Sequence, residues 1–342
     1  MEPRGIGERS DSGKGRTLGK GPHLGERADL DRPSAERRNF QGSSEVGDDW
    51  DADARRALDA GPPPHPGDPP SLRARLSRHR ASVMTALGWP MGFFTQYPYV
   101  RQVQPVTEPY PEVEARCEAS PFRDFLRRMQ GYRPTFASFG RTPGDPVLGR
   151  GMFPALDGMA AYVAVRRFAP ARILEIGSGD STYFLARGVG DNGHGKVTCI
   201  DPRPRRNVME LGVALEPRVL HASDADRAGD LRANDILFID SSHVLLPGMD
   251  VDIELNRMFP RLRRGVIVHL HDIFLPDDYP LNWKQRNYSE QNGLVGWLLG
   301  GAFEILWPAN YVYTRHTSLV EAAVGSVCDV GRGGGSLWLR KT

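Results

Sequence analysis

The chain has 342 residues, which is enough for two domains or for one domain with extensions. Its formal net charge of +2 gives no electrostatic reason to expect a nucleic acid or a membrane as partner, and we predict neither. Three scattered cysteines form no disulfide framework or metal-binding spacing, and no run of about 18 apolar residues is present, so a reducing cytoplasm without a membrane-spanning helix is expected.

The first 70 residues are predicted to form a disordered tail. They are rich in Gly, Pro, Ser and charged residues, and their few large apolar side chains cannot offset the entropy lost on ordering. A regulatory arm is one alternative. Another is translation from Met84, in which case residues 1–83 do not belong to the native protein; peptides from residues 1–70 in native material would exclude that start.

Residues 71–151 are predicted to form an irregular N-terminal cap with short helices. The pattern favours a basic helix over residues 72–86 and a second helix over 121–129, whose apolar side chains fall on one side. Residues 89–115 are rich in aromatic residues and proline and indicate an ordered but irregular lead-in. Residues 131–151 are expected to be a loop because Gly, Pro and Arg dominate them.

Residues 152–342 are predicted to form one α/β domain of the doubly wound, Rossmann-like type. A helix ends before Pro170, and strands are then expected at 173–176, 197–201, 218–222, 236–240 and 266–272. Helices are expected after Thr182 and over 207–215, 251–262 and 289–299. Strands alternating with helices indicate a parallel sheet covered on both faces. Two last strands, 303–307 and 336–340, lack a long helix between them and favour an antiparallel edge.

The most informative stretch is the glycine turn that follows the first strand. Gly177, Ser178 and Gly179 come directly after it, and Ser181 and Thr182 are placed to start a helix. Such a turn lets a ligand approach the backbone, and the helix N-terminus favours an anionic group. Either a dinucleotide or S-adenosylmethionine suits it, as does a glycine turn without any ligand.

Two residues separate these alternatives in part. Thr182 stands where a dinucleotide fingerprint requires a third glycine for close packing of helix on strand. Glu175, at the end of the strand, can hold a ligand ammonium group, which suits a cofactor that carries an amino acid. These two features favour S-adenosylmethionine over a dinucleotide.

Acidic residues recur at the ends of the predicted strands. Glu175, Asp201, Asp240 and Asp272 all lie there, and ligands of such sheets bind beyond the carboxyl ends of the strands. Asp201 follows the glycine turn by about two dozen residues, where an acid typically binds ribose hydroxyls. Asp240 and Asp272 are also candidate oxygen ligands for a divalent metal such as Mg²⁺, although two carboxylates alone are weak evidence.

Two histidines accompany these acids. His243 follows Asp240 by three residues, and His271 directly precedes Asp272. Histidine is the usual general base near neutral pH, so His243 is our first candidate for a catalytic base and His271 the second. The alternative for each is a structural histidine with hydrogen-bonded nitrogens.

Together these motifs resemble those of class I S-adenosylmethionine-dependent methyltransferases over residues 152–342. The sequence from Glu175 to Gly179 resembles the first motif of that superfamily, and residues 200–201, 237–240 and 265–272 resemble later ones. Residues 175–182, 238–243 and 271–280 are similar to a bacterial branch of it. The resemblance implies a seven-stranded sheet in the order 3-2-1-4-5-7-6, with the seventh strand antiparallel.

The resemblance also implies roles for the candidate residues. It assigns the glycine turn, with Ser181 and Thr182, to the methionine part of the cofactor, and Asp201 to its ribose. Asp240 and Asp272 match the two acids of metal-dependent catechol-type O-methyltransferases, but Ile273 stands where those enzymes have Asn, which speaks against a metal. Residues 274–286 are long enough to form a lid over the acceptor.

We therefore predict methyl transfer from S-adenosylmethionine to a small-molecule or glycan acceptor, with oxygen as the favoured acceptor atom. An NAD-dependent oxidoreductase on a related fold is the alternative enzyme class. A non-catalytic nucleotide-binding module is the alternative outside catalysis.

Overall fold

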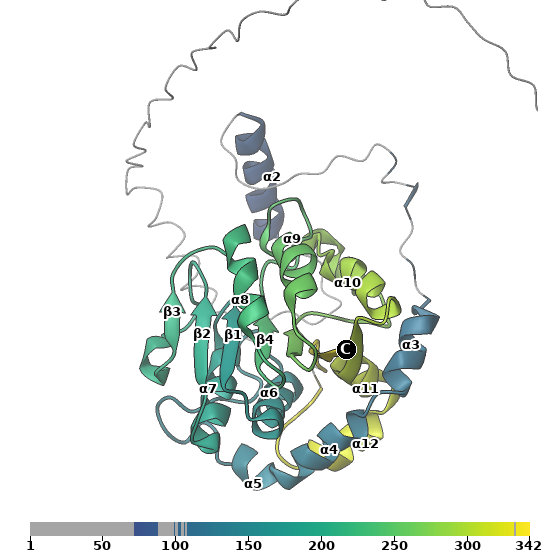
Figure 1. Cartoon of the computed structure of the whole chain (residues 1–342). Helices are drawn as coiled ribbons and strands as arrows, with labels where there is room; N and C mark the ends of the chain where they lie inside the picture. The colour runs from purple at the N-terminus through teal and green to yellow at the C-terminus, as the bar shows by residue number, and fades with distance from the viewer. Residues whose placement is uncertain (1–71, 88–98, 100–101, 104–105, 107, 332) are drawn as a thin grey trace, which may run out of the picture. The chain divides into compact units, whose positions relative to one another are not determined.

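The computed structural model describes residues 72–87, 99, 102–103, 106, 108–331 and 333–342 (Figure 1). The predicted disordered tail, residues 1–70, and most of the aromatic lead-in between 89 and 107 lie outside these residues. The basic helix predicted over 72–86 is confirmed as α2 (Leu72–Ala86). No helix among the described residues is long and apolar enough to cross a membrane.

The described residues contain a seven-stranded sheet in the predicted order, β3-β2-β1-β4-β5-β7-β6. Strands β1 to β5 pair in parallel, and β7 runs antiparallel to both β5 and β6. Figure 1 shows β3, β2, β1 and β4 side by side. The predicted α/β fold class is therefore confirmed. The strands are β1 (Arg172–Ile176), β2 (Lys196–Ile200), β3 (Ala214–Glu216), β4 (Ile236–Ile239), β5 (Ile267–Leu270), β6 (Phe303–Pro308) and β7 (Leu337–Lys341).

One face of the sheet is organised around a row of paired residues that runs across five strands. Cys199 pairs with Glu175, Glu175 with Phe238, Phe238 with His269 and His269 with Trp338. Helices α6 (Ala155–Phe168), α7 (Asp180–Asn192) and α4 (Phe122–Gly131) lie on this face. Burial of each large apolar side chain in such a core stabilises the fold by about 1.5–3 kcal/mol.

The opposite face carries the elements that connect β3 to β4, β4 to β5 and β5 to β6. Phe303 of β6 contacts Phe259 and Trp297, so η6 and α10 cover this side. Helix α9 continues through a π-helical segment into η6 without a break. These elements are α8 (Ala225–Asp230), α9 (Asp250–Ile253), η5 (Glu254–Met258), η6 (Phe259–Arg261) and α10 (Glu290–Leu299).

Two predicted elements near the edge of the sheet are wrong. Residues 207–215 are not one helix: they contain the short 3₁₀ turn η3 (Met209–Leu211) and the start of β3. The strand predicted at 218–222 is β3 instead, at 214–216. The physical reason is Gly212, whose left-handed φ of 70° ends the turn and lets the next residues pair with β2.

Several short helices fall where proline and glycine favoured loops. α3 (Pro111–Glu118) and α5 (Arg133–Phe136) each carry proline in the first turn, where its missing N–H costs no hydrogen bond. Two further helices, α11 (Ala309–Arg315) and α12 (Thr317–Val324), separate β6 from β7. The N-terminal helices share the hydrophobic core of the sheet, for example where Phe125 of α4 stacks on Trp307 at 5.6 Å between ring centroids.

Candidate active site

A cavity of about 560 Å³ lies beyond the carboxyl ends of β1, β2, β4 and β5. This is the edge at which parallel α/β sheets bind ligands. Most of the predicted site residues line it: Gly177, Ser178, Asp201, Asp240, His243, His271 and Asp272. Its wall also contains Arg203, Arg205, Asp250 and Tyr288, which sequence reasoning did not single out as site residues.

The two glycines of the turn do different things. Gly177 has a left-handed φ of 83°, and a Cβ there would lie 2.0 Å from the carbonyl oxygen of Asp240. Its absent side chain therefore lets β1 pass close to the end of β4. A Cβ on Gly179 would meet nothing within 4 Å, so the space beside this residue is open.

Asp201 is held against the turn by three hydrogen bonds. Its Oδ2 accepts from the backbone N–H of Ser178 at 2.7 Å and from the Ser178 hydroxyl at 2.9 Å, and its Oδ1 accepts from the N–H of Arg203 at 2.7 Å. Each carboxylate oxygen can accept more than one hydrogen bond. The carboxylate is thus fixed at the wall of the cavity with acceptor capacity left for hydroxyl groups of a ligand.

Glu175 lies behind the turn rather than on the cavity wall. It is fully buried and accepts hydrogen bonds from the Ser181 hydroxyl at 2.8 Å, the Thr182 hydroxyl at 2.9 Å and the Cys199 thiol at 3.1 Å. Burial raises the pKa of this carboxyl to about 7 despite these donors. Glu175, Ser181 and Thr182 thus fix the start of α7 to β1, while the predicted contact with a ligand ammonium remains a prediction.

Glu175→Gln should remove a pH-dependent loss of stability. The wild-type folded state keeps a proton that the unfolded state loses above its ordinary pKa of 4.5, so stability falls as pH rises from 4.5 to about 7. Thermal unfolding of the variant should lack this fall. Glu304→Gln, at an exposed position on β6, serves as the control. If cofactor affinity also drops in Glu175→Gln, the carboxylate holds the ammonium group after all.

The structure brings the two histidines and the two strand-end aspartates together. His243 Nε2 lies 3.4 Å from Asp240 and 3.6 Å from Asp272, and His271 Nδ1 lies 3.4 Å and 3.6 Å from the same two carboxylates. His243 and Asp272 both adopt left-handed backbone conformations, with φ of 61° and 55°. Such strain in non-glycine residues is common at functional sites.

Each histidine is also held from behind by a buried carboxylate that sequence reasoning missed. Nδ1 of His243 lies 2.9 Å from Glu290 Oε2, and Nε2 of His271 lies 3.3 Å from Asp157 Oδ2. Both acids are fully buried. A signal for Asp157 was present, because it is the single acid of helix α6 and precedes a mostly apolar stretch that runs to Val165. Glu290 carried no comparable signal, because it lies 47 residues from His243 in the chain.

The surrounding carboxylates decide the charge of these histidines. Burial disfavours the protonated rings, but Asp240, Asp272 and the rear carboxylates outweigh it and hold the pKa of His243 and of His271 well above the ordinary value. The two rings in turn hold the pKa of Asp240 well below its usual range, against the effect of burial. The carboxylates therefore favour the protonated form of both rings in the ligand-free protein.

His269, the third histidine of the segment, has a structural role. It is fully buried, stacks on Phe238 at 3.7 Å between ring centroids, and its Nε2 lies 2.9 Å from the Ser336 hydroxyl. Burial and the nearby charge of His271 hold its pKa well below the ordinary value. This neutral ring belongs to the core and does not line the cavity.

The predicted divalent metal finds no support in this arrangement. Within the part of the chain that the structure describes, no three His, Cys, Asp or Glu side chains are placed so that they could hold one ion. Asp240 and Asp272 instead face the ring nitrogens of His243 and His271.

The predicted lid, residues 274–286, consists of two different parts. Its first part is anchored: Arg315 binds Asp277 through two hydrogen bonds of 2.6 and 2.8 Å, and Asn310 and Gln291 bond to the same segment. The second part contains η7 (Leu281–Arg286), where the Arg286 guanidinium lies 3.7 Å from the centroid of Trp283. Trp283 also packs edge-on against Phe274 and Tyr288, so both parts contact the rest of the domain.

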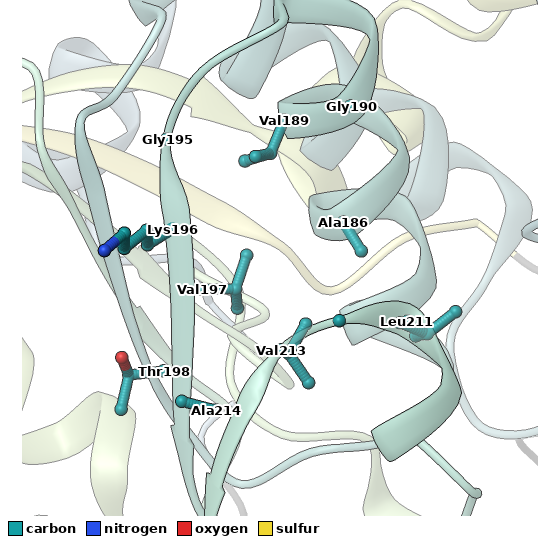
Figure 2. A pocket seen from close by; sticks show the side chains of 11 residues that line it. Ala186, Val189, Gly190, Gly195, Lys196, Val197, Thr198, Leu211, Val213 and Ala214 are labelled. Atoms are coloured by element: carbon teal, nitrogen blue, oxygen red, sulfur yellow. The ribbon is translucent and has the colours of Figure 1, made fainter.

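A second cavity, of about 310 Å³, lies away from these residues between α7 and the strands β2 and β3. Figure 2 shows Val197 of β2 and Val213 beside helix α7, which contributes Ala186 and Val189. The side chain of Lys196 points away from this apolar group. The lining holds no acid, histidine or cysteine, so it does not compete with the first cavity as a catalytic site.

Comparison with known proteins agrees with the fold. Residues 174–273 match a family model described as a methyltransferase domain, and no curated protein matches the chain. Among solved structures, cofactor-bound Rv0187 from MTB is 18% identical, with 64% of this chain and 89% of that chain covered and a TM-score of 0.37.

Two further structures contain S-adenosylmethionine. The O-methyltransferase TomG from Streptomyces achromogenes, involved in tomaymycin synthesis, is 19% identical, with coverage of 64% and 89% and a TM-score of 0.35. Human N-acetylserotonin methyltransferase is 16% identical, with coverage of 78% and 67% and a TM-score of 0.30. Sequence identities and TM-scores this low carry no information about the acceptor.

The matched segment runs from β1 through β5 and so includes the glycine turn and the acids at the strand ends. The sheet order is also the one that the resemblance to class I enzymes implies. The predicted enzyme class, an S-adenosylmethionine-dependent methyltransferase, is thereby confirmed. The similarity to one bacterial branch remains a resemblance.

Proposed function

We propose that this methyltransferase acts on an oxygen atom of a small-molecule or glycan acceptor, with His243 as the general base and His271 as the second candidate. The observation that supports the proposal is one cavity lined both by the glycine turn with Asp201 and by the Asp240, His243, His271 and Asp272 cluster. The residues proposed to bind the cofactor and the proposed base therefore line the same cavity. Oxygen is favoured because a hydroxyl acceptor has a proton to lose.

The cavity residues fit the proposed cofactor. Its volume of about 560 Å³ is within the usual range for small-molecule sites, and the open space beside Gly179 leaves room at the turn. Gly177 and Ser178 would hold the methionine part, Asp201 the ribose, and the Asp240 carboxylate would favour the positive charge. When bound, S-adenosylmethionine supplies a methyl group on a sulfonium sulfur.

Transfer is an in-line displacement in which the acceptor oxygen forms the new C–O bond. The C–S bond breaks, and its electron pair stays on sulfur. The chain holds the oxygen in line, which can lower the barrier by roughly 7–11 kcal/mol, and takes the hydroxyl proton at Nε2 of His243. Glu290 orients that nitrogen by its contact with Nδ1, 2.9 Å away.

If His243 is the base, its raised pKa should make turnover rise with pH. The surrounding carboxylates hold the pKa of His243 well above its ordinary value, and the ring accepts a proton only after losing its own. Turnover should therefore increase about tenfold per pH unit below the pKa of His243 and level off above it. The measurement is kcat against pH from 6 to 10, with saturating cofactor. A flat or falling profile would remove His243 as the base.

Ligand binding tests the cofactor directly. A ligand present at about 100 times its Kd stabilises the folded state by about 2.7 kcal/mol, so thermal unfolding should shift upward with S-adenosylmethionine and S-adenosylhomocysteine. NAD should produce no shift. The reverse pattern would favour the alternative oxidoreductase.

The acceptor can be found by supplying methyl-labelled cofactor to fractionated metabolite and oligosaccharide extracts. We expect the label in an alkali-stable ether. Incorporation should be the same with and without a chelator if no metal takes part. A label on nitrogen or carbon would contradict the preference for oxygen.

A further inference from the structure

Residues 333–335, the glycine segment that precedes β7, lie against two elements of the site. Gly335 and Ser336 are buried, and their backbone N–H groups donate hydrogen bonds of 2.8 and 3.0 Å to the two carboxylate oxygens of Asp157 in α6. The carbonyl oxygen of Gly335 accepts a hydrogen bond of 2.8 Å from the N–H of Ile273, just beyond β5. One short piece of backbone therefore links α6 to the segment that follows β5.

Gly335 lies against the backbone of Asp272, and no larger residue fits there without a shift. A Cβ on Gly335 would lie 3.2 Å from the Cα and 3.3 Å from the backbone nitrogen of Asp272, so one of the two backbones would have to move by a few tenths of an ångström. Gly335 does not have a left-handed φ, so its own conformation does not require glycine. The close approach to Asp272 does, because protein interiors are packed without spare space.

Asp157 connects the same segment to His271. Its Oδ2 atom, which accepts from Gly335, also lies 3.3 Å from Nε2 of His271. The Asp157 side chain is fully buried, and a buried carboxylate without partners would be costly. Two backbone donors and the imidazole supply those partners. The carboxylate thus holds Nε2 of the ring at the rear and leaves Nδ1 facing Asp240 and Asp272.

We propose that Gly335 and Asp157 are positioning residues for the histidine and aspartate side chains of the cavity. The Gly335 backbone fixes the place of Asp272, and Asp157 fixes the orientation of the His271 ring. Neither positioning residue lines the cavity, so each acts through a side chain that does. The inference rests on the proposed function, because Asp272 also lies 3.6 Å from Nε2 of His243, the proposed base.

The expected consequence is a loss of turnover with little loss of cofactor affinity. Asp272 lies 3.6 Å from a nitrogen of each histidine, so a shift of its backbone changes the geometry around the base. Misplacement by about 1 Å can cost about 10²-fold in rate, and a shift of a few tenths of an ångström should cost about tenfold. Cofactor binding is assigned to the glycine turn and Asp201, whose hydrogen bonds are independent of residues 333–335.

Gly335→Ala tests the positioning of Asp272 in the full chain. NMR of the imidazole groups, assigned from His243→Asn and His271→Asn, should show shifted resonances for both rings. The affinity for S-adenosylhomocysteine, measured by calorimetry, should stay within about twofold of wild type. Wild-type resonances of both rings in a folded Gly335→Ala protein would overturn the proposal.

The control is Gly300→Ala at the end of α10. Its Cβ would lie 3.0 Å from the backbone oxygen of Gly296, a comparably tight contact, and both histidine rings should keep their wild-type resonances. If the control shifts both rings as much as Gly335→Ala does, the effect is a general loosening of the domain and the proposal fails.

Asp157→Asn tests the second contact and decides the proposal if Gly335→Ala does not fold. Asparagine has nearly the same shape but offers one acceptor oxygen in place of two, so it cannot receive both backbone N–H groups and face the ring as before. The resonances of the His271 ring should shift more than those of His243. Unchanged His271 resonances in the folded variant would contradict the role of Asp157.

Turnover separates positioning from a purely structural role. With the acceptor that the labelling experiment identifies, kcat of Gly335→Ala should fall about tenfold while KM for the cofactor is unchanged. Shifted rings together with wild-type kcat would overturn the positioning role. If the rings shift but wild-type protein binds no S-adenosylhomocysteine, the proposed function fails and the contacts of Gly335 and Asp157 with the cluster stand.

Discussion

Gly177→Val should abolish S-adenosylmethionine binding and lower the stability of the whole domain. The valine Cβ would lie 2.0 Å from the Asp240 carbonyl oxygen, which belongs to the backbone and cannot rotate away. The residue also has a left-handed φ of 83°, which a β-branched side chain rarely adopts. Overpacking and backbone strain together should cost about 2–5 kcal/mol. Thermal unfolding and calorimetry with the cofactor measure the two losses.

Gly179→Ala is the matched control in the same turn. Its Cβ would meet no protein atom within 4 Å, so the folded state should keep its unfolding temperature. Because the added methyl group enters the open space that we assign to the cofactor, affinity should fall by about tenfold or more while the fold is unchanged. Wild-type affinity in a stable Gly179→Ala protein would place the cofactor away from the turn. An intact fold in Gly177→Val would contradict the packing of β1 against β4.

The parts of this site that the sequence predicts are those carried by local patterns. The apolar run before Gly177 fixes β1, and the acids Asp201, Asp240 and Asp272 follow strands whose parallel pairing brings their ends to one edge. Alternation of strands and helices was enough for the sheet. Its order, with β7 between β5 and β6, came from the resemblance of the motifs.

The parts that it does not predict depend on long-range contacts. Glu290 and Asp157 reach the histidines from other helices, and no local pattern marks an acid as the partner of a distant ring. In a regular strand, Asp272 would lie on the face opposite to His271, because successive side chains alternate. At this strand end alternation fails, because Asp272 turns into a left-handed conformation and lies 3.6 Å from His271.

The same limit applies to Glu175. A carboxylate before a glycine turn was expected to face a ligand, but the hydroxyls of Ser181 and Thr182, six and seven residues later, bind it from the helix. A polar residue in a strand that is buried on both faces must find a partner within the protein. The nearest donors happen to be those of α7.

His243→Ala should lower turnover by about 10²- to 10⁴-fold, the usual contribution of a general base. Affinity for S-adenosylmethionine should remain, because the turn and Asp201 do not contact the ring. Alanine also leaves the buried charge of Glu290 without a partner, which should destabilise the protein by about 3–5 kcal/mol. Turnover must therefore be expressed per cofactor-binding site, counted by calorimetry.

His243→Asn separates the chemical loss from the structural one. Its amide can still donate to Glu290 and so should recover much of the stability, yet it cannot accept a proton at neutral pH. We expect turnover as low as in His243→Ala together with the loss of the rising pH profile. If His243→Asn keeps wild-type turnover while His271→Asn loses it, the base is His271, held by Asp157 against the same two carboxylates. If both keep it, the acceptor loses its proton to solvent, and the histidines serve only to fix Asp240 and Asp272 beside the sulfonium.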